Sequence, residues 1–255
     1  MTKNQKTAKL EDWLPQFFEE YQTCRKVKEL PLSKPLVTRI NYQNLDAWFC
    51  SMKQPLVDAR SGAFQCDPWE IAGLGRDEVR NSSVLAWLLN PRGSHGLGEG
   101  ALTGLLGILN QYFRTGFPIK TGRFCSVKTE VNPNGEISNR VDIEIDSENF
   151  YLLIEVKIDA TEGKMQLKRY GDLTELNTQN SNRPWAIVLL TPDGYESKTA
   201  DNHASKVLSI SWHELSLVLE KSVVSAIQKN HDAKGASRIM AEQIVRRFLK
   251  RIQTF

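Results

Sequence analysis

Two short apolar runs, at residues 141–145 and 150–158, flank the turn-forming sequence Asp-Ser-Glu-Asn, and this pattern constrains the fold of the 255-residue chain most. Apolar and polar residues alternate in both runs, as in half-buried strands, because successive side chains point to opposite faces of a sheet. The pattern predicts a β-hairpin with one apolar face. The apolar face is expected to consist of Val141, Ile143, Ile145, Leu152, Ile154, Val156 and Ile158.

Three charged residues, Asp142, Glu155 and Lys157, lie on the opposite face of this predicted hairpin. Mg²⁺ prefers oxygen ligands, which the two carboxylates and the backbone carbonyl of Val156 could supply. The Lys157 ammonium could orient or activate a water molecule and neutralise charge on a phosphate. The pattern therefore favours metal-dependent phosphodiester hydrolysis, although an ordinary solvated strand face has the same composition.

A helix-like run, Glu162–Leu176, follows the second strand and carries Gln166 and Tyr170 four residues apart. Residues at this spacing project from the same face of a helix. We therefore expect both side chains to point in one direction, close to the end of the hairpin.

Together these residues resemble the PD-(D/E)xK nuclease superfamily, whose core carries Asp and then Glu-x-Lys on adjacent strands. The matching residues are Asp142, Glu155 and Lys157, with Val141 where the superfamily name has Pro. The run from Gln166 to Tyr170 is similar to the Gln-x-x-x-Tyr motif of RecB-like members, which contacts the site or DNA. The resemblance implies catalytic roles for all three charged residues and for Gln166.

The segment Arg76–Gly98 is similar to the amino-terminal helix of one bacterial branch of this superfamily. The resemblance implies that Glu78 lies near the metal, as a further ligand and catalytic residue. Without it, Glu78 is a carboxylate at a helix start, where the helix dipole favours negative charge. Ser82 would either pack against the sheet or bond near a phosphate, and His95 would either cap loop backbone or contact substrate. Glu130 is a lesser candidate, as a metal-shell residue or an ion-pair partner.

The predicted fold class is α/β, with a mixed central sheet of about four to five strands flanked by helices in a restriction-endonuclease-like core. Strands are expected near residues 124–131, 141–145, 151–158, 186–190 and 207–211. Within one compact domain, the expected parts are a helical N-terminal extension (1–70), the nuclease core (71–220) and a basic amphipathic C-terminal extension (221–255). The N-terminal part should contain an apolar helix at residues 13–21, a short helix at Asn41–Cys50 and a break near Lys53–Pro68.

The predicted last helix interleaves basic residues with apolar ones, and Arg246, Arg247 and Lys250 are among the basic set. These cations could bind phosphates, which would give sequence-independent, salt-sensitive affinity. A helix that packs its apolar stripe and solvates its charges has the same pattern, and a partner interface is a third use.

Composition sets broad limits. The net charge of +3 and isoelectric point near 8.6 do not by themselves demand nucleic acid. The polar N-terminus and the lack of a long apolar run predict a soluble, cytoplasmic protein without membrane contact. The four cysteines lack zinc-ligand spacing and are expected to be reduced and mostly buried.

The resulting prediction is a Mg²⁺- or Mn²⁺-dependent deoxyribonuclease that hydrolyses phosphodiester bonds. By analogy with the family, its setting is bacterial restriction or anti-phage defence. DNA is the expected partner, and a regulatory protein subunit or a homo-oligomer is compatible with the sequence. The alternatives are a non-cleaving nucleic-acid- or protein-binding subunit with a nuclease-like fold, and a ribonuclease.

Overall fold

The computed structural model describes residues 42–60, 67–114, 116–132, 140–229 and 236–255. The chain divides into two compact units, Met1–Phe64 and Gln65–Phe255. In the first unit, helix α2 (Tyr42–Arg60) covers residues 42–50 of the predicted short helix and continues to Arg60, so the expected break near Lys53–Pro68 is helical up to Arg60. The apolar helix predicted at residues 13–21 lies outside the described residues.

The second unit is built on a five-stranded mixed sheet in the order β1-β2-β3-β4-β5, which confirms the predicted fold class. The first three strands are antiparallel, and β4 and β5 continue the sheet parallel to β3. The strands are β1 (Cys125–Val131), β2 (Val141–Ser147), β3 (Tyr151–Val156), β4 (Trp185–Thr191) and β5 (Val207–Ser211).

The β2–β3 hairpin has the register that its alternating sequence predicts. Ile143 pairs with Ile154, and both side chains are buried on the same face. The turn closes where the backbone N–H of Ser147 donates to the carbonyl of Phe150 at 3.0 Å, and the Ser147 hydroxyl accepts the N–H of Phe150 at 3.1 Å. This turn fixes the face to which every later residue of β3 points.

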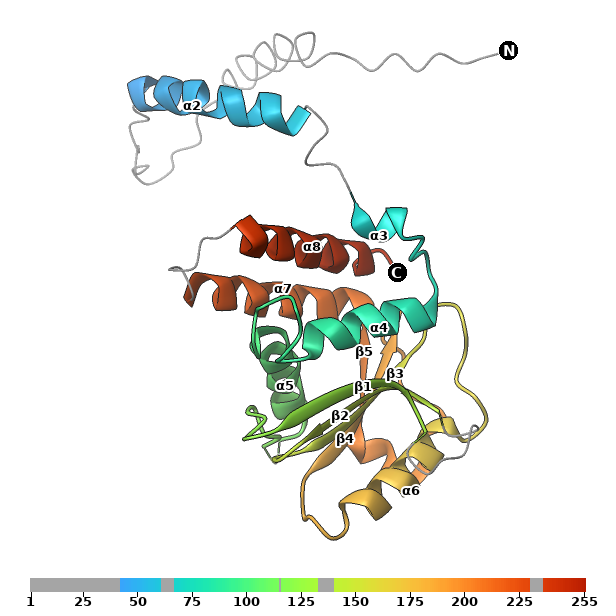
Figure 1. Ribbon diagram of the computed structural model, residues 1–255. Coiled ribbons are helices and arrows are strands. Elements are labelled where there is room, and N and C mark those ends of the chain that lie inside the picture. The colour runs from blue at the N-terminus through green and yellow to red at the C-terminus, as the bar shows by residue number, and fades with distance from the viewer. Residues whose placement is uncertain (1–41, 61–66, 115, 133–139, 230–235) are drawn as a thin grey trace, which may run out of the picture. The chain divides into compact units, whose positions relative to one another are not determined.

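Helices cover both faces of the sheet (Figure 1). Helix α6 (Gln166–Thr178) lies on one face, and α4 (Glu78–Leu89) and α5 (Gly100–Tyr112) lie on the other. Helix α6 begins later than the predicted Glu162, because the Glu162 carboxylate accepts hydrogen bonds from the Ser197 hydroxyl at 2.6 Å and the Lys198 N–H at 3.2 Å. These bonds hold the residues before α6 in a loop.

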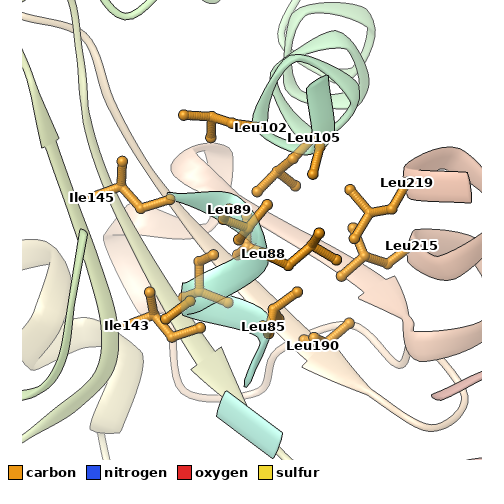
Figure 2. Close-up of a cluster of buried hydrophobic side chains, with 14 of the residues drawn as sticks. Leu85, Leu88, Leu89, Leu102, Leu105, Ile143, Ile145, Leu190, Leu215 and Leu219 are labelled. Carbon is orange, nitrogen blue, oxygen red and sulfur yellow. The ribbon is translucent and has the colours of Figure 1, made fainter. Parts of the chain in front are cut away.

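Leucines of α4 fill the space between the sheet and helices α5 and α7 (Trp212–Lys229) (Figure 2). Leu85, Leu88 and Leu89 are fully buried. They meet residues of the sheet and of both helices, among them Ile143, Ile145, Leu190, Leu102, Leu105, Leu215 and Leu219. Burial of these side chains holds α4 against the sheet, since each Å² of apolar surface removed from water stabilises the fold by about 25 cal/mol.

The cluster beneath α6 differs in one respect from the predicted alternation. Val141 packs there with Leu167 and Tyr170, not on the face of Ile143 and Ile145. The neighbouring Glu130 of β1 has left-handed backbone (φ 53°), and it interrupts the regular β1–β2 pairing opposite Asp142. The sheet therefore loses its regular pleat at this end.

The C-terminal helices belong to the same unit as the sheet. The expected limit between the nuclease core and the C-terminal extension, at residue 220, lies inside α7, and α8 (Ala236–Ile252) buries Val245, Phe248 and Leu249 in the main core. Short helix α3 (Pro68–Ile71) is tied to α8 where the indole N–H of Trp69 donates to the carbonyl of Ile244 at 3.0 Å.

Two further expectations concern the surface. Cys50 is exposed and Cys125 is half-buried, so the prediction of mostly buried thiols is wrong for the cysteines that the structure describes. Among the helices of the described ranges, none combines the length and the apolar character that crossing a membrane requires.

A short 3-10 helix, η3 (Asp201–Lys206), precedes β5.

Candidate active site

The candidate site lies where the β2–β3 ladder ends. Ile143–Ile154 is the last regular pair, and the same register would place Asp142 opposite Glu155. In place of a further backbone pair, the Asp142 carboxylate Oδ2 accepts the N–H of Val156 at 2.8 Å. The strands thus separate just where the two acidic side chains project from the same face.

Glu155 is 2% exposed, and its two carboxylate oxygens have different surroundings. Oε1 accepts from the Lys157 ammonium at 2.5 Å and from the Gln166 amide at 2.6 Å. Oε2 is buried and has no hydrogen-bond partner among the described residues. A buried carboxylate oxygen without a donor is costly, so a positively charged group beside Oε2 would stabilise the site.

Gln166 and Tyr170 lie on one face of the first turns of α6, as their spacing predicts. The Gln166 amide also donates to the Tyr170 hydroxyl at 2.9 Å, and this hydroxyl donates to the carbonyl of Arg140. Tyr170 is 1% exposed. The pair therefore joins the helix to the hairpin and aims the Gln166 amide at Glu155.

Glu78 lies at the start of α4 and holds the loop that follows β3. Its Oε1 accepts the backbone N–H groups of Ile158, Asp159 and Ala160 at 2.7, 3.2 and 3.1 Å. Asp77 caps the helix by accepting the N–H of Arg80 at 2.9 Å. Glu78 is thus next to Lys157, with one carboxylate oxygen occupied by backbone.

Burial shifts the ionisation of the site. It raises the pKa of Asp142 to about 6, against the bond from Val156 and the charge of Lys157. It also raises the pKa of Glu155 to about 7, with a further increase from the neighbouring Asp142. Burial alone would lower the pKa of Lys157, but the carboxylates of Glu155, Asp142 and Glu78 outweigh it and raise that pKa. Lys157 is therefore an ammonium at neutral pH.

Glu130 is the third acidic residue at this end of the sheet. Its Oε2 pairs with Arg140 at 2.9 Å, while its Oε1 is buried without a hydrogen-bond partner in the described part of the chain. Its charge contributes to the raised pKa of Asp142. The ion pair that the sequence suggested for Glu130 is present.

Two other candidates, Ser82 and His95, form hydrogen bonds to residues close to them in sequence. Ser82 is buried, and its hydroxyl donates to the carbonyl of Glu78 at 2.7 Å inside α4. His95 is 2% exposed, with Nδ1 accepting the Leu97 N–H at 2.9 Å and Nε2 lying 3.0 Å from the Asn90 carbonyl. Burial lowers the pKa of His95, which suits a neutral ring that caps loop backbone.

The basic candidates of α8 lie on the partly exposed side of that helix. Arg246 pairs with Glu242 at 2.9 Å, Arg247 is half-buried and Lys250 is exposed. No described contact joins these three side chains to the group around Glu155. The helix packs its apolar stripe into the core, which is the plainer of the alternatives that its sequence allowed.

Two residues that contact the site loop were not assigned a role from sequence. Arg76 binds the Asp159 carboxylate through Nε at 2.9 and 3.1 Å, and its Nη2 donates to the carbonyl of Ile158 at 3.1 Å. The indole N–H of Trp212 donates to the carbonyl of Lys157 at 3.1 Å. Both contacts span more than 50 residues, and a local pattern cannot signal them.

The donor set restricts the kind of metal the site could hold. Within the described ranges, no group of three or more His, Cys, Asp or Glu side chains is arranged to hold a metal ion. Asp142 and Glu155, with the main-chain oxygen of Val156, offer two carboxylates and a carbonyl. Such a sparse, all-oxygen set suits Mg²⁺ or Mn²⁺, which keep several waters and take others from substrate phosphate, and does not suit structural zinc.

Fold and site together define the class: a nuclease-like α/β protein whose acidic pair and lysine project from the end of a central hairpin. Comparison with protein families agrees, because the model described as the PD-(D/E)XK nuclease superfamily matches residues 66–240. The chain belongs to this superfamily, whose members generally use divalent metal ions. Neither the curated proteins nor the solved structures contain a significant match to the chain.

Proposed function

We propose that this protein is a Mg²⁺- or Mn²⁺-dependent deoxyribonuclease centred on Asp142, Glu155 and Lys157. The observation that carries the proposal is the buried Oε2 of Glu155, which has no donor among the described residues although Oε1 has two. A divalent cation would satisfy this oxygen. Burial raises the pKa of Glu155 because it disfavours the charged carboxylate, and a bound cation would favour that charged form.

Asp142, Glu155 and the carbonyl of Val156 would hold the ion. Glu78 is a further candidate ligand, restricted to the oxygen that does not hold the loop backbone. When bound, the ion would supply Lewis-acid polarisation of the phosphate and lower the pKa of a bound water. Glu130 lies on β1 opposite Asp142, and its negative charge would raise the pKa of Asp142.

Lys157 would act as a cation and not as a general base, because its neighbours raise its pKa. The ammonium would orient the attacking water and stabilise the negative charge that develops on the phosphate oxygens. Its contact with Glu155 sets its position before substrate arrives. Gln166, fixed by Tyr170, would keep the Glu155 carboxylate turned so that Oε2 faces the ion.

DNA is the substrate that the family resemblance favours. On the partly exposed side of α8, three basic residues are proposed to add weak, salt-sensitive contacts to DNA phosphates: Arg246, Arg247 and Lys250. Three buried residues are proposed to assist DNA binding by holding the backbone near the site: Ser82, His95 and Tyr170. The proposed setting is the bacterial cytoplasm, in restriction or anti-phage defence, with a regulatory protein partner.

Cleavage of single- and double-stranded DNA and matched RNAs, in Mg²⁺, Mn²⁺ and EDTA, tests the proposal. Wild type should cut DNA only with metal, and Lys157→Ala should reduce turnover by roughly 100-fold or more while Mn²⁺ still binds. Asp142→Ala and Glu155→Ala should abolish cutting and weaken Mn²⁺ binding by at least roughly tenfold, measured by calorimetry.

Lys164→Ala provides a matched control, since Lys164 is an exposed lysine between the hairpin and α6. This variant should cut at the wild-type rate. Cutting of RNA alone would correct the substrate. Wild-type turnover in the Asp142 and Glu155 variants would place the reaction elsewhere in the molecule.

A further inference from the structure

The loop that carries Lys157 is held at each backbone N–H from residue 156 to residue 160. After β3 ends, the chain leaves the sheet, and free N–H groups would be expected there. Instead each donates to an acceptor within 3.2 Å. The acceptors are Asp142 for Val156, the Leu190 carbonyl for Lys157, and Glu78 for Ile158, Asp159 and Ala160.

Two carbonyls of this loop are also held, and here the donors are side chains from distant segments. The Lys157 carbonyl accepts the indole N–H of Trp212 at 3.1 Å. The next carbonyl, that of Ile158, accepts from Arg76 at 3.1 Å. The peptide planes on the C-terminal side of Lys157 are therefore fixed from both the α4 and the α7 sides.

Phe255 contacts both of these donors. Its ring meets the Trp212 ring edge-on, with centroids 5.3 Å apart and an interplanar angle of 86°. The Arg76 guanidinium carbon lies 5.4 Å from the centroid of the same ring. Trp212 is fully buried, so its indole has little freedom to move away from the Lys157 carbonyl. One aromatic ring thus supports two hydrogen bonds to the lysine loop.

We propose that Trp212 is a positioning residue for Lys157, and that Phe255 supports it by packing on both Trp212 and Arg76. The inference rests on the proposed function and deepens it. The indole N–H sets the peptide plane that follows Lys157, and hence the direction from which its side chain reaches Glu155. Small displacements of a reacting group cost large factors in rate, because a positioned group is effective only within a narrow range of geometry.

The variant Trp212→Phe keeps an aromatic ring and removes the N–H donor. Trp69→Phe is its matched control, because Trp69 makes the same kind of bond, 3.0 Å to the Ile244 carbonyl, and also packs on a phenylalanine ring, that of Phe248. Both variants should lower Tm similarly. Only Trp212→Phe should lower kcat, by roughly 10- to 100-fold, with KM and Mn²⁺ affinity near wild type.

A second variant separates hydrogen bonding from packing. Replacement of Trp212 by benzothienylalanine, in which sulfur takes the place of the indole N–H, preserves shape and should reproduce the loss in kcat. Phe255→Leu should give a smaller loss in the same direction. Equal kcat in wild type and in the benzothienylalanine protein would overturn the proposal.

A readout that does not need activity separates this proposal from the deoxyribonuclease itself. The NMR signals of the Lys157 side-chain ammonium and of the Ile158 amide should shift in both Trp212 variants and stay in place in Trp69→Phe. If wild type cuts nothing, the proposed function fails, and these signals alone decide the role of Trp212. Unchanged signals in the Trp212 variants would overturn it.

Discussion

At the scale of single residues, the two carboxylate oxygens of Glu155 differ in their hydrogen-bond partners. Oε1 is held by the Lys157 ammonium and the Gln166 amide, and this leaves Oε2 buried without a donor among the described residues. The same burial that leaves this oxygen unpartnered also disfavours ionisation of the carboxyl group. On the proposed function, a proton and a metal ion would therefore compete for the same oxygen, Oε2.

This competition predicts an unusual dependence of stability on pH. Burial is the main cause that raises the pKa of Asp142 to about 6 and of Glu155 to about 7 in the folded protein. In the unfolded chain, carboxyl groups titrate at about pH 4. The raised pKa values of Asp142 and Glu155 therefore stabilise the folded protein fully below that pH, and this stabilisation is lost as pH rises through the folded pKa values. In EDTA, Tm should fall between about pH 5 and about pH 8, and Mn²⁺ should raise Tm more as pH rises.

Thermal unfolding at several pH values, with EDTA or Mn²⁺, measures this effect. The double variant Asp142→Asn, Glu155→Gln should remove most of the slope, because neither side chain can ionise. Glu175→Gln on the exposed side of α6 is the control and should retain the slope. An Mn²⁺ effect that is equal at pH 5 and pH 8 would contradict the prediction.

At the scale of elements, sequence predicted the strands better than the helices. All five strands lie within two residues of their predicted ends, because alternation, turn residues and β-branched side chains agree there. Helix α5 is absent from the sequence-based prediction, since its three glycines at 100, 104 and 107 obscure an otherwise apolar helical pattern. The start of α6 was placed too early because the Glu162 bonds to residues 197–199 are not visible in local sequence.

The glycines of α5 predict opposite effects of the same substitution. A Cβ at Gly104 would lie 2.9 Å from Cβ of Ser222 on α7, whereas a Cβ at Gly107 would meet nothing within 4 Å. Gly104→Ala should lower the free energy of unfolding by about 1–3 kcal/mol through overpacking. Gly107→Ala should raise it by about 0.5–1 kcal/mol, because alanine favours the helix.

Chemical denaturation of both variants gives the two values on one scale. Cleavage should be unaffected in either protein, since α5 contributes no side chain to the candidate site. Stabilisation by Gly104→Ala would mean that α5 and α7 can separate without cost, against the close contact between them.

At the scale of the molecule, the local sequence pattern predicts the residues of the candidate site but not the distant residues that hold them in place. Asp142, Glu155, Lys157, Gln166 and Tyr170 fall within 29 residues of sequence, and the structure brings them together as that pattern predicts. The side chains that hold the lysine loop in place, those of Arg76, Glu78 and Trp212, come from parts of the chain more than 50 residues away. Long-range contacts of this kind depend on tertiary packing, which a single sequence does not display.

The extent of the folding unit can be tested by truncation. A chain of residues 65–255 contains the whole second unit and should unfold cooperatively and bind Mn²⁺ like the full-length protein. A chain of residues 65–235 lacks α8, and with it the buried Val245, Phe248, Leu249 and Ile252. This shorter chain should lose the cooperative transition, because each such side chain stabilises by about 1.5–3 kcal/mol.

Circular dichroism with thermal unfolding distinguishes the two chains. The sequence-based prediction of one compact domain agrees with this expectation, because the C-terminal extension (221–255) is then part of the same folding unit. A sharp transition in residues 65–235 would contradict it and would assign α8 a role outside the fold.

The order in which the chain is synthesised gives the lysine loop another meaning. Asp142 is bonded to a residue only 14 positions away, whereas the donor to the Lys157 carbonyl lies 55 positions further on. A ribosome thus releases both acidic residues well before Trp212, and Phe255 later still. On the proposed function, a nascent chain that ends before Trp212 would carry both carboxylates without the indole that positions Lys157, and its turnover would be lower than that of a chain that includes Trp212.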